Sequence, residues 1–448
     1  MSLELQIIFN KNAVMILPSG VNKGSGVLAA LKELNLSPHN VVGVGDAEND
    51  HAFLGSCECS VAVSNALPAL KERADWVTAH AHGTGVEELI QLLLKDDLQE
   101  LEPRLKRHQT LLGASPSDGP FFLPSYNCRL LIAGPSGSGK STVVSALLER
   151  LAQSQHQICL FDPEGDYEGF EQFLTLGGPD RIPTPTEILD ALNNPKQSLV
   201  VNLLGVPLAD RPSFFQGVLA RVQELRFRTG HPHWLIVDEA HHVLPKELAN
   251  AENVIPKDPE SLVLVTVHPD SVSPAILKSV NTIIAVGPEP QALLDGFNQN
   301  AGSNLQWHAR QPETNQTGTL LVWNVSDGGI PQTVKLEPGK GERRRHHRKY
   351  AEGTLGEDRS FYFRGPFGRL NLRVQNMNLF AQIAEGVDED TWQFHRVHGD
   401  YSRWLRETIK DGDFAGVVEG VEKNNSLDAK ESRRQIVEAV RKHYTAPA

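Results

Sequence analysis

The sequence of 448 residues is long enough for about three folding units. Its 40% hydrophobic and 22% charged residues are typical of a globular protein, which excludes a disordered, collagenous or coiled-coil chain. The net charge is −12, and it is uneven: residues 340–448 carry 20 Lys and Arg against 17 Asp and Glu, leaving 23 against 38 for residues 1–339. That acidic excess repels phosphate backbones, so general nucleic-acid affinity is not expected and a nucleic-acid partner stays uncertain.

No stretch approaches the roughly 18 to 20 consecutive apolar residues that a membrane span needs, and the N-terminus is too short for a signal peptide. We therefore expect a soluble, cytoplasmic protein without a membrane partner. The cysteines form no Cys-x-x-Cys pair, so reduced, buried thiols are expected at Cys57, Cys59, Cys128 and Cys159.

Residues 1–95 have the pattern of an α/β domain. Short β-branched runs at 41–44 and 60–63 predict strands, and the apolar periodicity of 85–94 predicts a helix. Residues 96–120 are charged and then rich in Ser, Pro and Gly, which predicts a helix followed by a linker.

Residues 121–338 predict a second α/β domain. Apolar runs alternate with helical stretches at 141–153 and 212–228, and continuous Val, Ile and Leu runs are typical of parallel strands buried on both faces. The expected strands are Leu130–Ala133, Gln157–Phe161, Ser198–Leu203, Trp234–Val237, Leu262–Val267 and Thr282–Val286.

A basic linker at 339–352 and a mostly helical C-terminal module at 353–448 complete the chain. The run Arg343–Lys349 either contacts phosphates or is an exposed linker, and its shortness favours the linker. Aromatic residues alternate with arginines in Ser360–Pro366 and Gly399–Arg406; such mixtures can stack on bases, but core packing is favoured. The charge pattern of Glu431–His443 predicts an amphipathic helix.

One segment of the second domain carries a phosphate-binding motif. The residues Gly134, Pro135, Ser136, Gly137, Ser138, Gly139, Lys140 and Ser141 match G-x-x-x-x-G-K-[ST] between an expected strand and an expected helix, and Thr142 follows. Glycines let backbone N–H groups turn toward phosphates, Lys140 reaches the β and γ oxygens, and Ser141 can ligate Mg²⁺. The alternative is a glycine-rich turn without a ligand.

About 100 residues later, an apolar strand ends in two acids, Asp238 and Glu239. Asp238 can hold the metal and its water shell, and Glu239 stands where a base orients and deprotonates an attacking water. The pair indicates hydrolysis; the alternative is a solvated acidic turn.

Residues from about 128 to 290 resemble the HerA-type ATPases. The resemblance lies in Ala133–Thr142, Phe161–Tyr167, Val237–His241, Thr266–Pro274 and Asn281–Thr282. It implies a RecA-like sheet, ATP with Mg²⁺, and a homo-oligomeric ring in which a neighbouring subunit donates an arginine.

Two features depart from that family. Val267 stands where the family has a sensor glutamine, which leaves Thr266 and His268 as the nearby polar residues. No arginine can be chosen as the donor, since each candidate is expected to be a solvated helix charge: Arg211, Arg221, Arg226 and Arg228.

The N-terminal domain resembles the last part of haloacid-dehalogenase-type phosphatases of the sugar-phosphatase branch. The likeness lies in Asn22–Gly24, Val44–Asp50 and further matches to about residue 94. It implies that Lys23 neutralises a phosphoryl group and that Asp46 and Asp50 hold Mg²⁺. The family's nucleophile is an Asp in an Asp-x-Asp pattern, but the first Asp of this sequence is Asp46, so we expect negligible phosphatase turnover.

The sequence therefore predicts a RecA-like, Mg-dependent ATPase between a partial haloacid-dehalogenase-like domain and a helical module. Two alternatives stay open. One is a sugar-phosphate phosphatase of a longer gene product with a regulatory ATPase, and the other is a nucleotide-dependent assembly switch without significant turnover.

Overall fold

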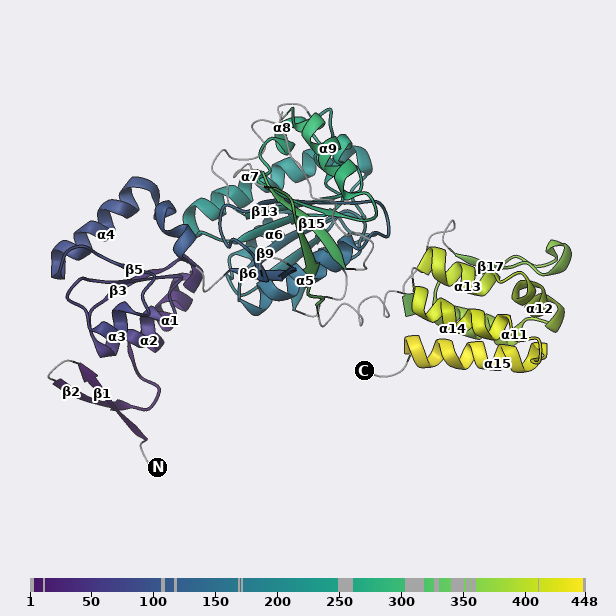
Figure 1. The fold of residues 1–448 in the computed structure, drawn as a ribbon, viewed down its shortest axis with the longest axis horizontal. Coiled ribbons are helices and arrows are strands. Elements are labelled where there is room, and N and C mark those ends of the chain that lie inside the picture. Colours follow the sequence, from purple (N-terminus) through teal and green to yellow (C-terminus); the bar gives the residue numbers. More distant parts are fainter. Residues whose placement is uncertain are drawn as a thin grey trace. The chain divides into compact units, whose positions relative to one another are not determined.

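The computed structural model describes residues 4–10, 13–105, 109–116, 119–167, 170, 172–248, 261–302, 318–325, 330–339, 350–351, 355, 360–409 and 411–445. The chain divides into two compact units, Met1–Gly339 and Lys340–Ala448 (Figure 1). The basic run at 343–349 lies outside the described residues.

The first unit begins with a small α/β part. A hairpin of β1 (Leu5–Asn10) and β2 (Ala13–Pro18) precedes a parallel sheet in the order β3 (Val42–Gly45), β4 (Cys59–Ala62), β5 (Trp76–Val77). Its helices are α1 (Lys23–Leu34), α2 (His51–Leu54), α3 (Pro68–Lys71) and α4 (His82–Asp96). Helix α1 starts at Lys23 because Asn22 and Ser25 form a reciprocal capping box.

The larger part of this unit is built on an eleven-stranded sheet with the order β10-β11-β9-β12-β13-β8-β14-β15-β16-β6-β7. Seven neighbouring strands are parallel: β10 (Phe173–Gly177), β11 (Ser198–Asn202), β9 (Ile158–Asp162), β12 (Trp234–Val237), β13 (Ser261–Thr266), β8 (Arg129–Ala133) and β14 (Thr282–Val286). The helices are α5 (Lys140–Gln153), α6 (Pro185–Leu192), α7 (Arg211–Thr229), α8 (Pro274–Leu277) and α9 (Pro290–Ala301).

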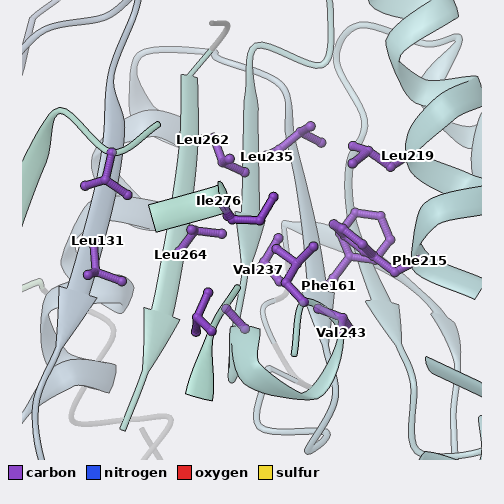
Figure 2. Packing of buried hydrophobic residues seen from close by; sticks show 14 of the residues in the cluster. Leu131, Phe161, Phe215, Leu219, Leu235, Val237, Val243, Leu262, Leu264 and Ile276 are labelled. Carbon is purple, nitrogen blue, oxygen red and sulfur yellow. The ribbon is translucent and has the colours of Figure 1, made fainter. Parts of the chain in front are cut away.

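The sheet buries both of its faces, as the continuous apolar strands predicted. Every residue of β9, β11, β12, β13 and β14 is buried. Figure 2 shows one face, on which Phe215 and Leu219 of α7 lie beside Phe161 and Leu235 of the strands. The other face packs against α5 through Val143, Leu147 and their neighbours. The expected α/β class with a parallel sheet is confirmed.

The prediction of a linker at 96–120 is wrong for its second half. Strand β6 (Thr110–Ser115) pairs with β7 (Gly119–Leu123) and with β16 (Gln332–Leu336), and β16 pairs with β15 (Thr319–Asn324), so these strands extend the sheet in antiparallel fashion. The glycines that suggested a linker serve the strands: a Cβ at Gly113 would lie 2.1 Å from the Lys335 carbonyl oxygen, and Gly119 has φ of +78°.

A group of histidines packs within the same unit. The rings of His39 and His156 stack at 3.9 Å, and His233 meets both edge-on. Burial lowers the pKa of His233 well below its ordinary value, with the neighbouring imidazoles adding to the effect. The contact is therefore made by an uncharged His233 at neutral pH.

Arg226 of α7 corrects another expectation, because it is not a solvated charge. It is 4% exposed and donates hydrogen bonds to the carbonyl oxygens of Pro232 (2.6 Å), His233 (2.9 Å) and Ser261 (3.3 Å). The guanidinium thus satisfies carbonyl groups just before β12 and at the start of β13.

The second unit is mostly helical, as expected. It contains the two-stranded ribbon β17 (Phe361–Phe363) and β18 (Leu372–Val374), followed by α11 (Met377–Gly386), α12 (Glu389–Val397), α13 (Asp400–Trp404), α14 (Gly412–Glu422) and α15 (Ala429–Val440). Phe361, Phe363, Tyr401 and Trp404 are buried in one core, which confirms core packing for these aromatic residues.

Membrane-spanning helices and cysteine pairing were the two remaining expectations. In the described parts of the chain, no helix combines the length and apolar character needed to cross a bilayer. All four cysteines are buried and none of them forms a disulfide with another, as predicted.

Arg226→Ala should lower the free energy of unfolding by roughly 2–3 kcal/mol, because three buried carbonyl oxygens lose a charged donor. Arg228→Ala is the matched control, since Arg228 lies on the exposed side of the same helix. Urea unfolding of both variants measures the difference, and equal stability of the two would contradict the structural role of Arg226.

Candidate functional site

The phosphate-binding motif forms a tight turn from β8 into α5. A Cβ atom on Gly134 would lie 2.2 Å from the Val286 carbonyl oxygen and 2.6 Å from Ser138 Oγ. Gly137 and Gly139 have φ of +74° and +103°, conformations that L side chains rarely adopt. The turn therefore needs its glycines for shape, which argues against an arbitrary glycine-rich connection.

Lys140 is the first residue of α5 and folds back over this turn. Its ammonium donates to the carbonyl oxygens of Gly134 (2.8 Å) and Pro135 (3.1 Å), and the residue is 8% exposed. The other residues of the turn stay accessible: Pro135, Ser136, Gly137 and Ser141 are exposed, and Ser138, Gly139 and Thr142 are half-buried.

The carboxyl ends of four neighbouring strands meet at this turn. Gly134 N–H donates to the Thr266 carbonyl at the end of β13 (3.4 Å), and Asp238 N–H donates to the Phe161 carbonyl of β9 (3.0 Å). Since β9, β12, β13 and β8 are consecutive in the sheet, Asp162, Asp238 and Thr266 follow one another along the edge that carries the motif. The structure thus brings the predicted Asp238 and Glu239 to the side of Lys140.

This edge concentrates negative charge in a buried place. Burial raises the pKa of Asp238 to about 8, and repulsion from Asp162, Glu239 and Asp166 contributes. Burial also lowers the pKa of Lys140, although Glu239, Asp238 and Glu164 oppose that shift. The site therefore gathers more carboxyl groups than Lys140 alone compensates, and this favours the protonated form of Asp238.

Glu239 is held in an uncommon conformation. Its φ of +38° and ψ of +55° place a non-glycine residue in the left-handed region. Burial raises its pKa, as does Glu164, while Lys140 and the Val267 N–H lower it. Backbone strain of this kind clusters at functional sites, and here it turns a carboxylate toward the ammonium of the motif.

His241 links Glu239 to the end of β13. Its Nδ1 lies 3.4 Å from Glu239 Oε2 and 3.1 Å from Thr266 Oγ1, which also accepts the His268 N–H (3.1 Å). Burial lowers the pKa of His241 to about 4, with His242, His268 and Lys140 contributing, so the ring is neutral at pH 7. Thr266 and His268 thus lie beside the acids, although Val267 replaces the expected glutamine.

Two acidic residues of the site were missed as site residues by the sequence reasoning. Asp162 is fully buried and accepts the N–H groups of Asp166 (3.1 Å) and Tyr167 (2.8 Å), which folds the segment after β9. Glu164 in that segment acts electrostatically on Lys140 and Glu239. An apolar strand that ends in Asp162 is the signal that could have found them, because it repeats the pattern of β12 with Asp238.

The groups present fit a nucleotide with a divalent cation. Within the described residues, Ser138 Oγ and Glu239 Oε2 are buried and accept no hydrogen bond. Those residues contain no cluster of three or more His, Cys, Asp or Glu placed to hold a metal by themselves. Mg²⁺ bound with a triphosphate takes one or two protein ligands and completes its shell with phosphate oxygens and water.

The N-terminal part brings together two of its three candidate residues. Lys23 Nζ lies 2.5 Å from Asp50 Oδ1, and Asp50 Oδ2 accepts the N–H groups of Asp46 (2.8 Å) and Ala47 (3.0 Å). Burial opposes ionisation of Asp50, but Lys23 and these amides outweigh it and lower its pKa. Asp50 therefore anchors Lys23 to the loop after β3, where Asp46 also lies; their roles in phosphate and Mg²⁺ binding stay predictions.

Two family models match segments of the chain. Residues 6–90 match haloacid dehalogenase-like hydrolases, and residues 127–195 match the central domain of the helicase HerA. Both resemblances are therefore confirmed. The second match contains the phosphate-binding motif and Asp162, but it ends before Asp238 and Glu239.

Curated relatives named phosphoglycolate phosphatases are similar to about a fifth of the chain. Phosphoglycolate phosphatase 2 of Saccharolobus solfataricus is 45% identical over 89 residues, which are 20% of this chain and 38% of that protein. A phosphoglycolate phosphatase of Methanothermobacter thermautotrophicus is 40% identical over 79 residues, 18% of this chain and 36% of that protein. The chain thus spans less than half the length of these relatives.

Solved structures resemble the larger part at low identity. The genome packaging NTPase of Sulfolobus turreted icosahedral virus 2, in complex with AMPPCP, is 17% identical with a TM-score of 0.36, over 47% of this chain and 98% of that one. VirB4 of Thermoanaerobacter pseudethanolicus is 14% identical with a TM-score of 0.38, over 52% of this chain and 97% of that one.

Gly134→Ala should weaken binding of a fluorescent ATP analogue at least tenfold, because the new methyl group collides with the Val286 carbonyl and deforms the turn. Gly296→Ala on α9 is the matched control, since a Cβ there meets nothing within 4 Å. Fluorescence titration measures the affinities, and unchanged binding by Gly134→Ala would contradict a phosphate-binding role for the turn.

Proposed function

We propose that the chain binds ATP at residues 134–142 and hydrolyses it in a Mg²⁺-dependent reaction. The observation that carries the proposal is the convergence of this turn with Asp238 and Glu239 at one edge of a buried sheet. A glycine-shaped turn binds phosphates by its backbone N–H groups, and the N-terminus of α5 adds a favourable dipole. The match to the HerA central domain supports the same assignment.

Lys140 has the role of a mobile phosphate ligand. Its ammonium is held by two backbone carbonyl oxygens, which are weak partners compared with charged phosphate oxygens. We propose that it leaves Gly134 and Pro135 to contact the β and γ oxygens, where it stabilises the charge that develops during transfer.

Glu239 is proposed as the base that orients and deprotonates the attacking water. Its raised pKa suits proton transfer near neutral pH, and Oε2 has an open acceptor position within the described surroundings. His241 and Thr266 would position this carboxylate, replacing the missing sensor glutamine in linking the site to the end of β13.

Ser141 and Asp238 are the proposed Mg²⁺ ligands. When bound, the cation supplies the positive charge that balances the phosphate oxygens. Ser141 is exposed at the start of α5, and Asp238 lies among carboxylates whose repulsion a cation relieves.

The proposal also covers the oligomeric state and the cellular location of the protein. In a homo-oligomeric ring, Arg221 and Arg228 are the candidates of α7 for donation to a neighbouring site, because both are exposed whereas Arg226 is fully engaged. The free, buried thiols support a cytoplasmic location. The acidic balance of residues 1–339 disfavours duplex DNA as a substrate of the ATPase edge.

Glu239→Gln should lower steady-state phosphate release from ATP by roughly 10²–10⁴-fold, because the amide cannot accept the proton of the attacking water. Binding of a nonhydrolysable ATP analogue should be retained, and chelation of Mg²⁺ by EDTA should stop turnover of the unmodified chain. Retained binding with negligible turnover in the unmodified chain would instead support the assembly switch.

We propose that the N-terminal part acts as a binding and assembly module and does not hydrolyse a phosphate ester. The covalent mechanism implied by its family needs an aspartate nucleophile, and the first Asp in this sequence is Asp46. Because the relatives are named phosphoglycolate phosphatases, 2-phosphoglycolate is the substrate to test.

Phosphate release from 2-phosphoglycolate with Mg²⁺ should therefore stay at background, and Lys23→Ala should not change it. Lys140→Ala, assayed alongside, controls for the ATPase site. Turnover that is kept in Lys140→Ala and lost in Lys23→Ala would show that the N-terminal part is a working phosphatase.

A further inference from the structure

A loop of the second unit displays an aromatic ring and arginines that its core does not use. Residues 364–371 connect β17 to β18, and the loop of residues 364–369 within this connection is closed by a hydrogen bond from Leu370 N–H to the Arg364 carbonyl (3.0 Å). Phe361 and Phe363 before it are buried, so the chain turns from the core to the surface at Arg364.

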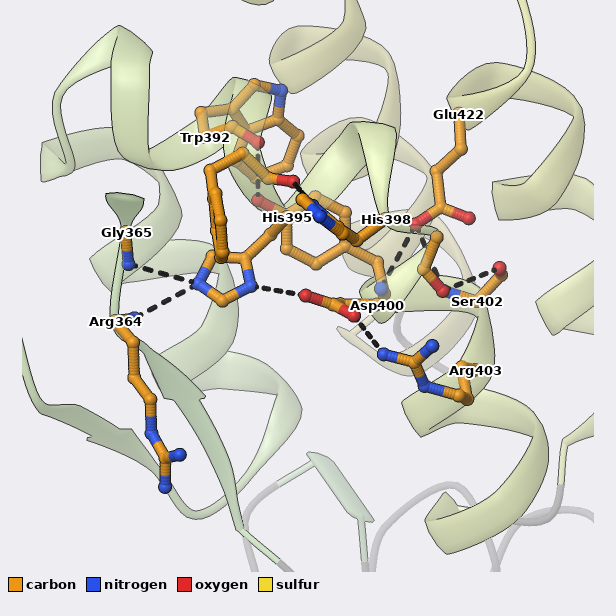
Figure 3. A network of polar contacts seen from close by, with 12 residues as sticks. Arg364, Gly365, Trp392, His395, His398, Asp400, Ser402, Arg403 and Glu422 are labelled. Carbon is orange, nitrogen blue, oxygen red and sulfur yellow. Dashed lines mark hydrogen bonds and ion pairs between the residues drawn. The ribbon is translucent and has the colours of Figure 1, made fainter. Parts of the chain in front are cut away.

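The base of the loop is held by buried polar groups, as Figure 3 shows. His395 Nε2 accepts the N–H groups of Arg364 (3.0 Å) and Gly365 (3.4 Å), and its Nδ1 lies 2.7 Å from Asp400 Oδ2. Because Nε2 faces two donors, these partners assign the proton to Nδ1, which donates it to Asp400. Asp400 also pairs with Arg403.

Gly365 fixes the path of the loop further. Its φ is +66°, and a Cβ atom there would lie 2.6 Å from Thr391 Oγ1 on α12. The first residues of the loop are therefore set by α12 and the His395–Asp400 pair.

The tip of the loop shows an outlier without a packing reason. Phe367 has φ of +65° and ψ of +15°, a conformation that is unfavourable for a bulky residue, yet the residue is 93% exposed. The Arg369 guanidinium lies 5.8 Å from the centre of the Phe367 ring. An exposed ring in a strained backbone points to a use outside folding.

A cavity of about 550 Å³ lies beside this tip. Aromatic side chains and arginines line it, among them Tyr362, Arg364, Phe367, Phe394, Arg403 and Trp404. The lining carboxylates are Asp400, which His395 and Arg403 already compensate, and the exposed Glu407. Within the described residues, Arg364 and Arg369 take part in no ion pair, so both keep their charge for a ligand.

We propose that the 364–369 loop and this cavity bind single-stranded nucleic acid, with bases stacked on Phe367 and phosphates contacted by Arg364 and Arg369. Exposed aromatic faces flanked by guanidinium groups are the chemistry that binds such strands without sequence selectivity. The local sequence supports the location, because residues 360–384 contain Arg364, Arg369 and Arg373 but no Asp or Glu. The proposal does not depend on ATP hydrolysis.

The test is fluorescence polarisation of the full chain with labelled oligo(dT) of about twelve nucleotides, competed by unlabelled oligonucleotide. Phe367→Ala should weaken binding roughly 5- to 150-fold, since base–aromatic stacking contributes about 1–3 kcal/mol. Arg364→Ala and Arg369→Ala should each weaken binding and reduce the salt dependence by about 0.7 in the logarithmic slope.

Matched controls come from other surfaces of the same unit. Val417→Ala removes an exposed apolar side chain from α14, and Arg434→Ala removes an exposed arginine from α15; both should bind as the unmodified chain does. Phe367→Ala should also keep the unmodified rate of ATP turnover.

Four results would overturn the proposal. No binding at about 50 mM salt, or equal binding by Phe367→Ala and the unmodified chain, would remove this surface as a strand site. Thymidine monophosphate that competes as well as the oligonucleotide would show a mononucleotide pocket, and loss of binding in Lys140→Ala alone would assign the strand to the ATPase part.

Discussion

The arrangement of the larger part depends on one electrostatic contact, the buried ammonium of Lys140 beside the carboxylates of Asp238, Glu239 and Glu164. These groups reach the same place because the strands that precede them are neighbours in a parallel sheet. Lys140 compensates only part of this group of carboxyl groups, and burial and repulsion raise the pKa of Asp238 to about 8. The proposed triphosphate with Mg²⁺ would fit this arrangement, since the cation would offset the carboxylates and the phosphates would face the turn and its lysine.

The sequence reasoning located the local parts of this site and missed the parts that depend on strand order. The phosphate-binding turn and the Asp238–Glu239 strand end are each continuous in sequence, so the spacing of their residues was enough to recognise them. The pairs Asp162–Asp238 and His241–Thr266 come from strands that are adjacent only in space. β6 was missed because its pairing with β16 joins residues more than 200 positions apart. Arg226 was judged exposed because no local pattern shows that three carbonyl oxygens surround it.

The three parts of the chain differ in how completely their chemistry is assembled. The central part has a turn shaped by glycines, Glu239 in a strained conformation, and buried acceptor atoms without a hydrogen bond at Ser138 and Glu239. The N-terminal part has a lysine and an aspartate that satisfy each other, which explains their proximity without a substrate. In the second unit, His395 and Asp400 support the loop of residues 364–369, and Phe367 at the tip of this loop is exposed to solvent. Glu239 and the exposed Phe367 are two of the non-glycine residues with positive φ, and backbone strain of this kind clusters at functional sites.

Calorimetric titration of a nonhydrolysable ATP analogue into the full chain, with Mg²⁺ and again in EDTA, tests the central claim most directly. The account predicts one site per chain and much tighter binding of the analogue with Mg²⁺ than in EDTA. Asp238→Asn should still bind the analogue, but with an affinity that Mg²⁺ no longer increases. Absence of binding heat under both conditions, or an affinity that Mg²⁺ and Asp238→Asn leave unchanged, would contradict the account.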